Sequence, residues 1–233
     1  MSGPLAMKGR EADTTPAPLA AGIGTCDEAD GLAAIHKPGM ELVIWRRALP
    51  ACLQTWLEDM DASRLPGLRL LVRPGTFRHA VEPHLDDCGM PPGDMRDLLV
   101  ADVEELVLTF SGITGSDLVD VRLERVRDDA CWKFHRDCVD ARLLTTYRGP
   151  STEWVHPVHA ERALHEQTAY EGPLERLRVH DVAIFKGRCA GPGSGIVHRS
   201  PPIAGSGQTR LLLCLNKPSS ASPEPWGPDP SRT

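Results

Sequence analysis

Residues 131–155 read CWKFHRDCVDARLLTTYRGPSTEWV, and the spacing of two polar side chains in this stretch sets the expectation for the whole chain. His135 and Asp137 are separated by one residue. In a β-strand, side chains two positions apart point to the same face, so an imidazole and a carboxylate would lie next to each other. Such a pair forms two corners of a metal site. A third ligand has to come from elsewhere, and His198, in GIVHRSPP, is the best candidate.

The composition describes a globular chain with a core of its own. The chain has 233 residues, of which 41% are hydrophobic, and 21 Gly and 21 Pro predict many turns and irregular ends. The net charge is −6, with no long run of Lys or Arg. This balance argues against nucleic acid or an anionic membrane as a partner. The substrate, whether small molecule or protein, and the oligomeric state stay open.

The cysteines favour a reducing compartment. Seven cysteines are scattered along the chain without a CxxC pair, which is not the pattern of a disulfide framework or a zinc knuckle. The N-terminus has no apolar run typical of a signal peptide, and no segment approaches the roughly 18 apolar residues of a membrane span. We therefore expect a cytoplasmic protein.

The chain divides into three parts by composition. Residues 1–27 and 218–233 are rich in small residues and proline, and both are expected to be disordered. Residues 28–217 are expected to form one domain. Within it, residues 40–115 should be the helical part and residues 116–216 a β-barrel.

Local periodicity places the elements of the N-terminal half. The runs MELVIW at 40–45 and LRLLV at 68–72 are short and apolar, as buried strands are. Helical spacing of apolar residues predicts helices over 49–60 and 94–110. The stretch 73–92 holds several Pro and Gly and is expected to be a loop with at most one helical turn.

The hydrophobic period changes from 3.6 to 2 after residue 115. Val119, Val121 and Leu123 alternate with charged residues, which predicts a strand with one buried face. Further strand-like runs follow, separated by turn residues: CWKFHRD, ARLLTTYR, RVHDVAIFKG and QTRLLLCLN. Helices followed by strands predict an α+β chain whose C-terminal half is a β-sandwich or barrel.

The three ligand candidates suit a particular metal. Two neutral imidazoles and one carboxylate on one face of an ion leave further positions open, which is the facial triad of non-haem Fe(II). Arg210 opens an apolar strand twelve positions after His198. Because a guanidinium grips a carboxylate through two parallel hydrogen bonds, Arg210 is a credible anchor for a dicarboxylate cosubstrate.

This ordered pattern of H-x-D, a long gap, a His and then an Arg resembles the Fe(II)/2-oxoglutarate-dependent dioxygenase superfamily. The resemblance implies a double-stranded β-helix, a jelly-roll barrel of the cupin type, in the C-terminal half. It implies three Fe(II) ligands: His135, Asp137 and His198. It also places the C5 carboxylate of 2-oxoglutarate at Arg210, with Tyr147 or Thr145 as a second cosubstrate contact.

The whole chain also resembles an uncharacterised bacterial family, a domain of unknown function (1826), through FHRD, RLLTTYRGPSTEWV and VHRSPP. That resemblance covers most of residues 40–216 and brings no activity with it.

Other side chains near the motif compete for a metal. His156 and His159, in HPVH, surround a proline and are interpreted as loop residues near the mouth of the site. Cys131 and Cys138 flank His135, and thiolate with imidazole suits zinc. In a strand, however, position 138 faces away from position 135, so a compact site with both thiols is not expected. Cys131 alone could lie near the metal.

Three functions remain open at this point. The leading hypothesis is a metal-dependent oxidoreductase that uses Fe(II) and 2-oxoglutarate to hydroxylate or oxidise an unknown substrate. The alternative is a non-catalytic protein that binds or senses zinc, because two histidines and one aspartate accept zinc as well. A third is an interaction domain that has lost its metal.

Overall fold

Two β-sheets of unequal size organise residues 22–227, which are the residues that the computed structural model describes. The larger sheet has seven strands in the order β1-β2-β8-β5-β10-β4-β3, and the smaller has three in the order β7-β6-β9. Neighbouring strands are antiparallel except β1 and β2. The strands of the larger sheet are β1 (Gly22–Cys26), β2 (Met40–Trp45), β3 (Leu68–Val72), β4 (Val119–Val126), β5 (Ala141–Arg148), β8 (Val182–Lys186) and β10 (Arg210–Asn216). Those of the smaller sheet are β6 (Glu153–Trp154), β7 (Glu175–Arg176) and β9 (His198–Arg199).

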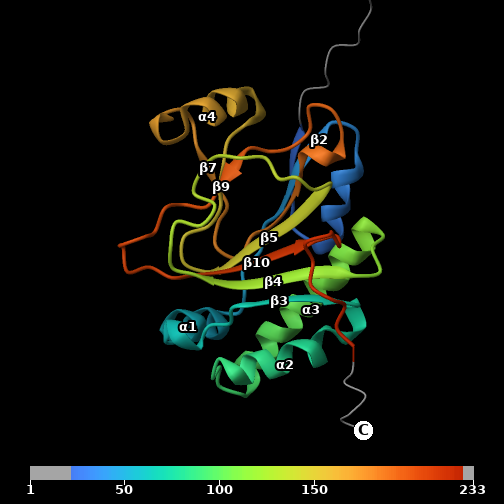
Figure 1. Ribbon diagram of the computed structural model, residues 1–233, viewed down its shortest axis with the longest axis vertical. Helices are drawn as coiled ribbons and strands as arrows, with labels where there is room; N and C mark the ends of the chain where they lie inside the picture. The colour runs from blue at the N-terminus through green and yellow to red at the C-terminus, as the bar shows by residue number, and fades with distance from the viewer. Residues whose placement is uncertain (1–21, 228–233) are drawn as a thin grey trace, which may run out of the picture.

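The α-helices fall into two groups at opposite ends of the molecule (Figure 1). Three of them lie together: α1 (Ala51–Asp59), α2 (Phe77–Asp87) and α3 (Asp94–Thr114). The short α4 (Ala160–Glu166) lies at the other end, near β7 and β9. Short 3₁₀ helices complete the chain: η1 (Ala29–His36), η2 (Ala62–Arg64), η3 (Pro74–Thr76), η4 (Pro157–His159), η5 (Gln167–Ala169) and η6 (Arg188–Ala190).

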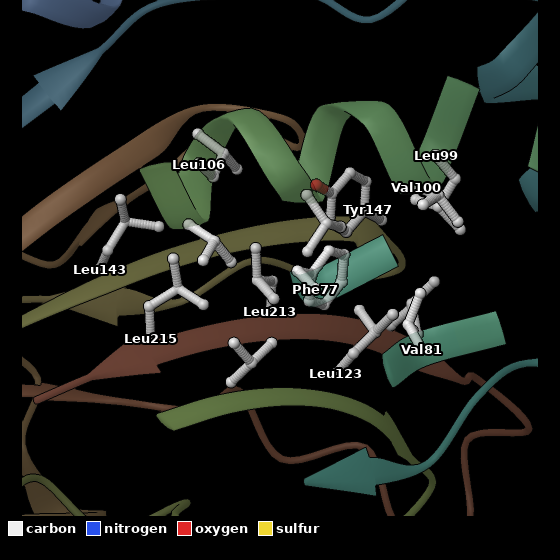
Figure 2. Packing of buried hydrophobic residues seen from close by; sticks show 14 of the residues in the cluster. Phe77, Val81, Leu99, Val100, Leu106, Leu123, Leu143, Tyr147, Leu213 and Leu215 are labelled. Atoms are coloured by element: carbon white, nitrogen blue, oxygen red, sulfur yellow. The ribbon is translucent and has the colours of Figure 1, made fainter. Parts of the chain in front are cut away.

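The main core lies between the larger sheet and α1–α3 (Figure 2). Strand β10 shows how the sequence builds it. Leu211, Leu213 and Leu215 point toward the helices and are fully buried there. Because side chains alternate along a strand, the residues between them point to the opposite face, where Cys214 joins a second cluster.

The longest helix follows the predicted apolar stripe. All five stripe residues are buried in the main core: Leu99, Val103, Leu106, Val107 and Phe110. The helix continues one turn beyond the predicted end, to Thr114. Gly115 then takes φ +63°, a left-handed conformation that glycine adopts without steric cost and that commonly ends a helix.

The smaller sheet covers the other face of the larger one. Trp154 of β6 packs in one cluster with Leu144 of β5, Phe185 of β8 and Cys214 of β10. The space between the two sheets is therefore distinct from the core under the helices. Side chains of β5 and β10 that point into it are candidates for a binding site.

The α+β class with a large, mostly antiparallel sheet agrees with the prediction, but the N-terminal third is not a separate helical part. Strands β1, β2 and β3 come from this third and form both edges of the larger sheet. The strands expected at 40–45 and 68–72 are present with those bounds.

The loop expected over residues 73–92 was wrong, because it contains α2. Pro83 lies inside this helix and removes one backbone hydrogen bond. Phe77, Val81 and Leu85 recur at helical spacing and are almost completely buried. Their burial offsets the cost of the proline.

The ordered part of the chain is longer than expected at both ends. Residues 22–26, assigned to the disordered leader, form β1, and the rest of that leader, 1–21, lies outside the described residues. In the predicted tail, the backbone N–H of Trp226 donates to the carbonyl of Leu71 at 2.7 Å, and its side chain packs on the core. Residues 228–233 again lie outside the described part. No helix within 22–227 has the length and apolarity to cross a membrane.

A matched pair of Leu→Ala variants tests whether the main core lies between the larger sheet and the helices. Leu213 is fully buried at the centre of the sheet, whereas Leu108 of α3 is 53% exposed. Leu213→Ala should lower the free energy of unfolding by about 2–5 kcal/mol, because a cavity remains after the side chain is removed. Leu108→Ala should change it by no more than about 0.5 kcal/mol. Urea denaturation of both variants measures this difference, and equal effects would contradict the packing described here.

Candidate metal centre

A short antiparallel bridge brings two histidines side by side. The backbone N–H of His135 donates to the carbonyl of His198 at 3.0 Å, and the N–H of His198 donates back to the carbonyl of His135 at 3.0 Å. Two residues paired in this way carry their side chains on the same face. The two imidazole rings accordingly lie with their centroids 4.6 Å apart.

The bridge between His135 and His198 is isolated, so His135 does not lie in a regular strand as expected. His198 begins β9, but the strand predicted over CWKFHRD does not form, and residues 127–140 are a loop between β4 and β5. The predicted convergence of the H-x-D pair is nevertheless present, because the bridge fixes the backbone at His135 itself.

Asp137 completes a compact group with the two histidines. Its Oδ2 lies 3.4 Å from Nε2 of His198, and its Oδ1 lies 3.7 Å from Nε2 of His135. The three side chains each offer one ligand atom, and these atoms all lie within 4.8 Å of one another. Among residues 22–227 this is the group of His, Cys, Asp or Glu side chains arranged closely enough to hold a metal ion.

Hydrogen bonds to backbone carbonyls fix the tautomer of both rings. Nδ1 of His135 lies 2.8 Å from the carbonyl of Lys133, and Nδ1 of His198 lies 3.1 Å from the carbonyl of Ile196. In each case the carbonyl belongs to the residue two positions earlier. Because a carbonyl only accepts, Nδ1 must carry the proton, which leaves a lone pair on each Nε2 of the neutral rings.

Burial keeps His198 neutral. Its side chain is 5% exposed, and burial lowers the pKa of His198 to about 4, an effect that the neighbouring carboxylate of Asp137 only partly offsets. At neutral pH the ring is therefore an acceptor at Nε2 rather than an imidazolium.

Asp137 is oriented by a cation yet keeps one unsatisfied oxygen. Its Oδ1 accepts a hydrogen bond from Nη1 of Arg142 at 2.5 Å, and Nε of Arg142 donates to Asn216 at 2.8 Å. Its Oδ2 is buried and has no hydrogen-bond partner in the described part of the chain. This oxygen faces the lone pair on Nε2 of His198 at 3.4 Å, an arrangement that costs free energy unless a cation lies between them. The residues therefore fit a divalent metal with two imidazole ligands and one carboxylate.

A small cavity of about 70 Å³ adjoins the two histidines of this group. His135, His198, Leu212 and Cys214 contribute to its wall. Cys131 also lines it, so this thiol does lie near the candidate metal centre. Its backbone takes φ +55°, which is rare and strained for a residue other than glycine.

Arg210 is a buried cation without a hydrogen-bond partner in the described part of the chain. It is 0% exposed, and alternation along β10 puts its side chain on the same sheet face as Leu212 and Cys214. Its Nε, Nη1 and Nη2 are all buried, and none has a hydrogen-bond partner among residues 22–227. Burial lowers the pKa of Arg210 to about 10, which still leaves the guanidinium charged at neutral pH.

Tyr147 and Thr145 do not face this cavity, which corrects their prediction as cosubstrate contacts. Both point toward the helices: Tyr147 donates its hydroxyl hydrogen to Asp102 of α3 at 2.5 Å, and Thr145 pairs with Leu213, whose side chain is in the main core. Figure 2 shows Tyr147 among the core residues beneath α3. The residue between them, Thr146, belongs to the opposite face by alternation.

The other predicted competitors are not part of the group. His156 precedes η4 and is exposed, and His159 ends η4. Cys131 and Cys138 are both exposed free thiols, and within the described residues neither belongs to a cluster that could hold a metal.

Arg142 is a residue whose role the sequence did not predict. Its hydrogen bond to Asp137 spans a turn that local periodicity does not reveal.

Comparison with known proteins places the chain in a family. A family model described as "Protein of unknown function (DUF1826)" matches residues 26–216. The chain belongs to this family. The predicted membership is thereby confirmed, and the metal centre described above lies inside the matched region. No curated protein matches the chain.

Two solved structures from bacteria show a distant likeness to this DUF1826 protein. A prolyl-4-hydroxylase of Pseudomonas putida is 12% identical, with a TM-score of 0.40 over 82% of this chain and 94% of that one. AviO1 of Streptomyces viridochromogenes Tue57 is 14% identical, with a TM-score of 0.34 over 80% of this chain and 93% of that one. Likenesses this remote carry no weight for function, which has to be inferred from the site.

Removal of one ligand should abolish metal binding. Asp137→Ala eliminates the carboxylate between the two histidines, so the protein should lose its stoichiometric divalent metal. His156→Ala, a change at an exposed histidine outside the group, should leave the metal content unchanged. Elemental analysis of both proteins after loading with Fe(II) or Zn(II) measures this. Full metal content in the Asp137→Ala protein would exclude the proposed ligand set.

Proposed function

We propose that this protein is a metal-dependent oxidoreductase that uses Fe(II) and 2-oxoglutarate to oxidise or hydroxylate a substrate. The observation that carries this proposal is a combination on one side of the larger sheet. Three candidate ligand side chains converge and one carboxylate oxygen of Asp137 is unsatisfied, while a fully buried arginine on the same sheet face has no hydrogen-bond partner among residues 22–227.

The metal would be held by His135, Asp137 and His198. Three protein ligands leave room in the coordination sphere, which a redox metal needs for an oxidant and a cosubstrate and a structural zinc ion does not. When bound, iron and 2-oxoglutarate supply the oxidation: one atom of O₂ enters the substrate and the other enters succinate, with release of CO₂. The protein provides the geometry and the surroundings.

Charge pairing on this face of the larger sheet favours Arg210 as the anchor for a carboxylate. The three arginines that line the small cavity have carboxylate partners: Arg122 bonds Glu124, Arg142 bonds Asp137 and Arg199 bonds Glu153. Arg210 has none within the described residues. A buried cation without a partner costs several kcal/mol, and a bound carboxylate with two hydrogen bonds would offset that cost.

The remaining residues orient the ligands and limit access of water. Arg142 holds the carboxylate of Asp137, and Phe185 packs against the ring of His198 with centroids 5.0 Å apart. The cavity beside His135 and His198 is about 70 Å³, so it holds little bulk water. The double-stranded β-helix is the fold that this proposal implies, and two facing sheets with the ligands between β9 and the loop before β5 support it.

Loss of the buried cation should weaken the binding of 2-oxoglutarate. Arg210→Met keeps the apolar stem and removes the guanidinium, and should raise the KM for 2-oxoglutarate by about tenfold or more, because a charge-assisted contact contributes about 1.5–3 kcal/mol. Arg210→Lys should restore part of this affinity through its charge but not the two parallel bonds. Succinate release by Fe(II)-loaded protein measures the effect.

Tyr147→Phe is the matched control for Arg210→Met. Tyr147 lies on the next strand but faces the helices, so removal of its hydroxyl should leave the KM for 2-oxoglutarate unchanged. If the wild-type protein holds stoichiometric zinc, releases no succinate and shows no new absorption band with Fe(II) and 2-oxoglutarate under anaerobic conditions, the oxidoreductase proposal is wrong and a zinc-binding role replaces it.

A further inference from the structure

A wide cleft opens next to the candidate metal centre. It has a volume of about 790 Å³, within the usual range for small-molecule sites. Residues 134–136 lie on one side of it, α4 contributes Glu161 and Leu164, and the glycine-rich segment 191–194 contributes the opposite wall. Figure 1 shows that α4 stands at the end of the molecule away from α1–α3, so the helical core does not cover this region.

The cleft communicates with the metal centre through His135. This residue lines both the cleft and the small cavity beside the ligands. Its side chain is 34% exposed, whereas those of Asp137 and His198 are each 5% exposed. A molecule in the cleft would therefore meet the metal centre on the side of His135.

Hydrogen bonds to Glu41 hold the glycine-rich wall of the cleft in place. The carboxylate of Glu41 accepts hydrogen bonds from the hydroxyl of Ser194 at 3.1 Å and from the backbone N–H of Gly195 at 2.8 Å. Gly195 has φ +110°, and a Cβ added there would lie 3.1 Å from the backbone nitrogen of Arg188. A side chain at this position would therefore push the wall away from Arg188.

The charges in the cleft do not balance. Arg136 is already engaged, because its Nε donates to the carbonyl of Gly195 at 3.0 Å and its Nη2 donates to Glu161 at 2.8 Å. The guanidinium of Arg188 forms no hydrogen bond or ion pair within residues 22–227. Its backbone N–H donates to the carbonyl of Asp137 at 2.9 Å, so this arginine is tied directly to a metal ligand.

We infer that this cleft receives the substrate, and that the substrate has an acid group bound by Arg188 and an apolar part that contacts Phe134, Leu164 and Pro192. The inference rests on the proposed function for its chemistry. The acid group is a carboxylate or a phosphate, since either accepts the paired hydrogen bonds of a guanidinium.

Binding of simple probes tests the inference without turnover. The probes are 3-phenylpropionate, 2-phenylethyl phosphate and the neutral 3-phenylpropanamide, added to Zn(II)-loaded protein with excess 2-oxoglutarate to occupy Arg210. Ligand-observed NMR should show at least one acid bound about tenfold more tightly than the amide, and the better acid identifies the group. Arg188→Ala should abolish this preference, and Arg188→Lys should keep part of it.

Arg73→Ala is the matched control, because Arg73 is exposed on the loop before α2 and does not line the cleft. It should leave the preference intact. Replacement of Zn(II) by paramagnetic Mn(II) should broaden the signals of the bound acid, as its position beside His135 requires. Equal binding of acids and amide, or an unchanged preference in Arg188→Ala, would overturn the inference.

The probe experiment separates this inference from the proposed function. Binding to the Zn(II)-loaded protein needs neither iron nor turnover, so an acid preference that depends on Arg188 supports the cleft even if no succinate is ever released. Succinate release together with loss of the acid preference would have the opposite meaning: the oxidoreductase proposal would stand and the substrate assignment would be wrong.

Discussion

The two backbone hydrogen bonds between His135 and His198 are the constraint on which the site depends. They join a loop to the first residue of β9 and set both imidazoles on one side, 63 positions apart in the chain. Each ring is then turned by a bond to the carbonyl two residues earlier, so both lone pairs face Asp137. Because backbone atoms define this geometry, the ligands are oriented before any metal binds, which reduces the entropy that binding would otherwise cost.

Alternation along β5 and β10 supplies the second constraint. One face of these strands is apolar and packs under the helices, and the other presents Arg142, Cys214 and Arg210 to the space between the sheets. A shift of one residue would exchange the two faces and place Arg210 in the main core. Leu213 pairs with Thr145, and both side chains point to the helix side. This register therefore keeps Arg210 on the opposite face, on the side of the candidate metal ligands.

This dependence explains what the sequence could and could not predict. The strands at 40–45, 68–72 and 141–148 were predicted with their observed bounds, because hydrophobic period is a local property. The grouping of His135, Asp137 and His198 was also predicted, from residue types and order. The face of Tyr147 was not, since the sequence does not say which side of a strand meets the helices. The pairing of Arg142 with Asp137, the tie between Arg188 and the Asp137 carbonyl and the docking of Trp226 on Leu71 depend on tertiary contacts that no local pattern contains.

The charges around the candidate metal centre bear on the cosubstrate that we propose. Asp137 contributes one negative charge, and Arg142 balances it. A divalent ion together with the buried Arg210 would then leave a positive excess on this side of the larger sheet. In buried surroundings charges interact more strongly than in bulk water. A neutral ligand would leave that excess in place, and a monoanion could satisfy the ion or the arginine but not both. A dianion whose two acid groups are separated by a short chain would satisfy both at once, and 2-oxoglutarate has this form.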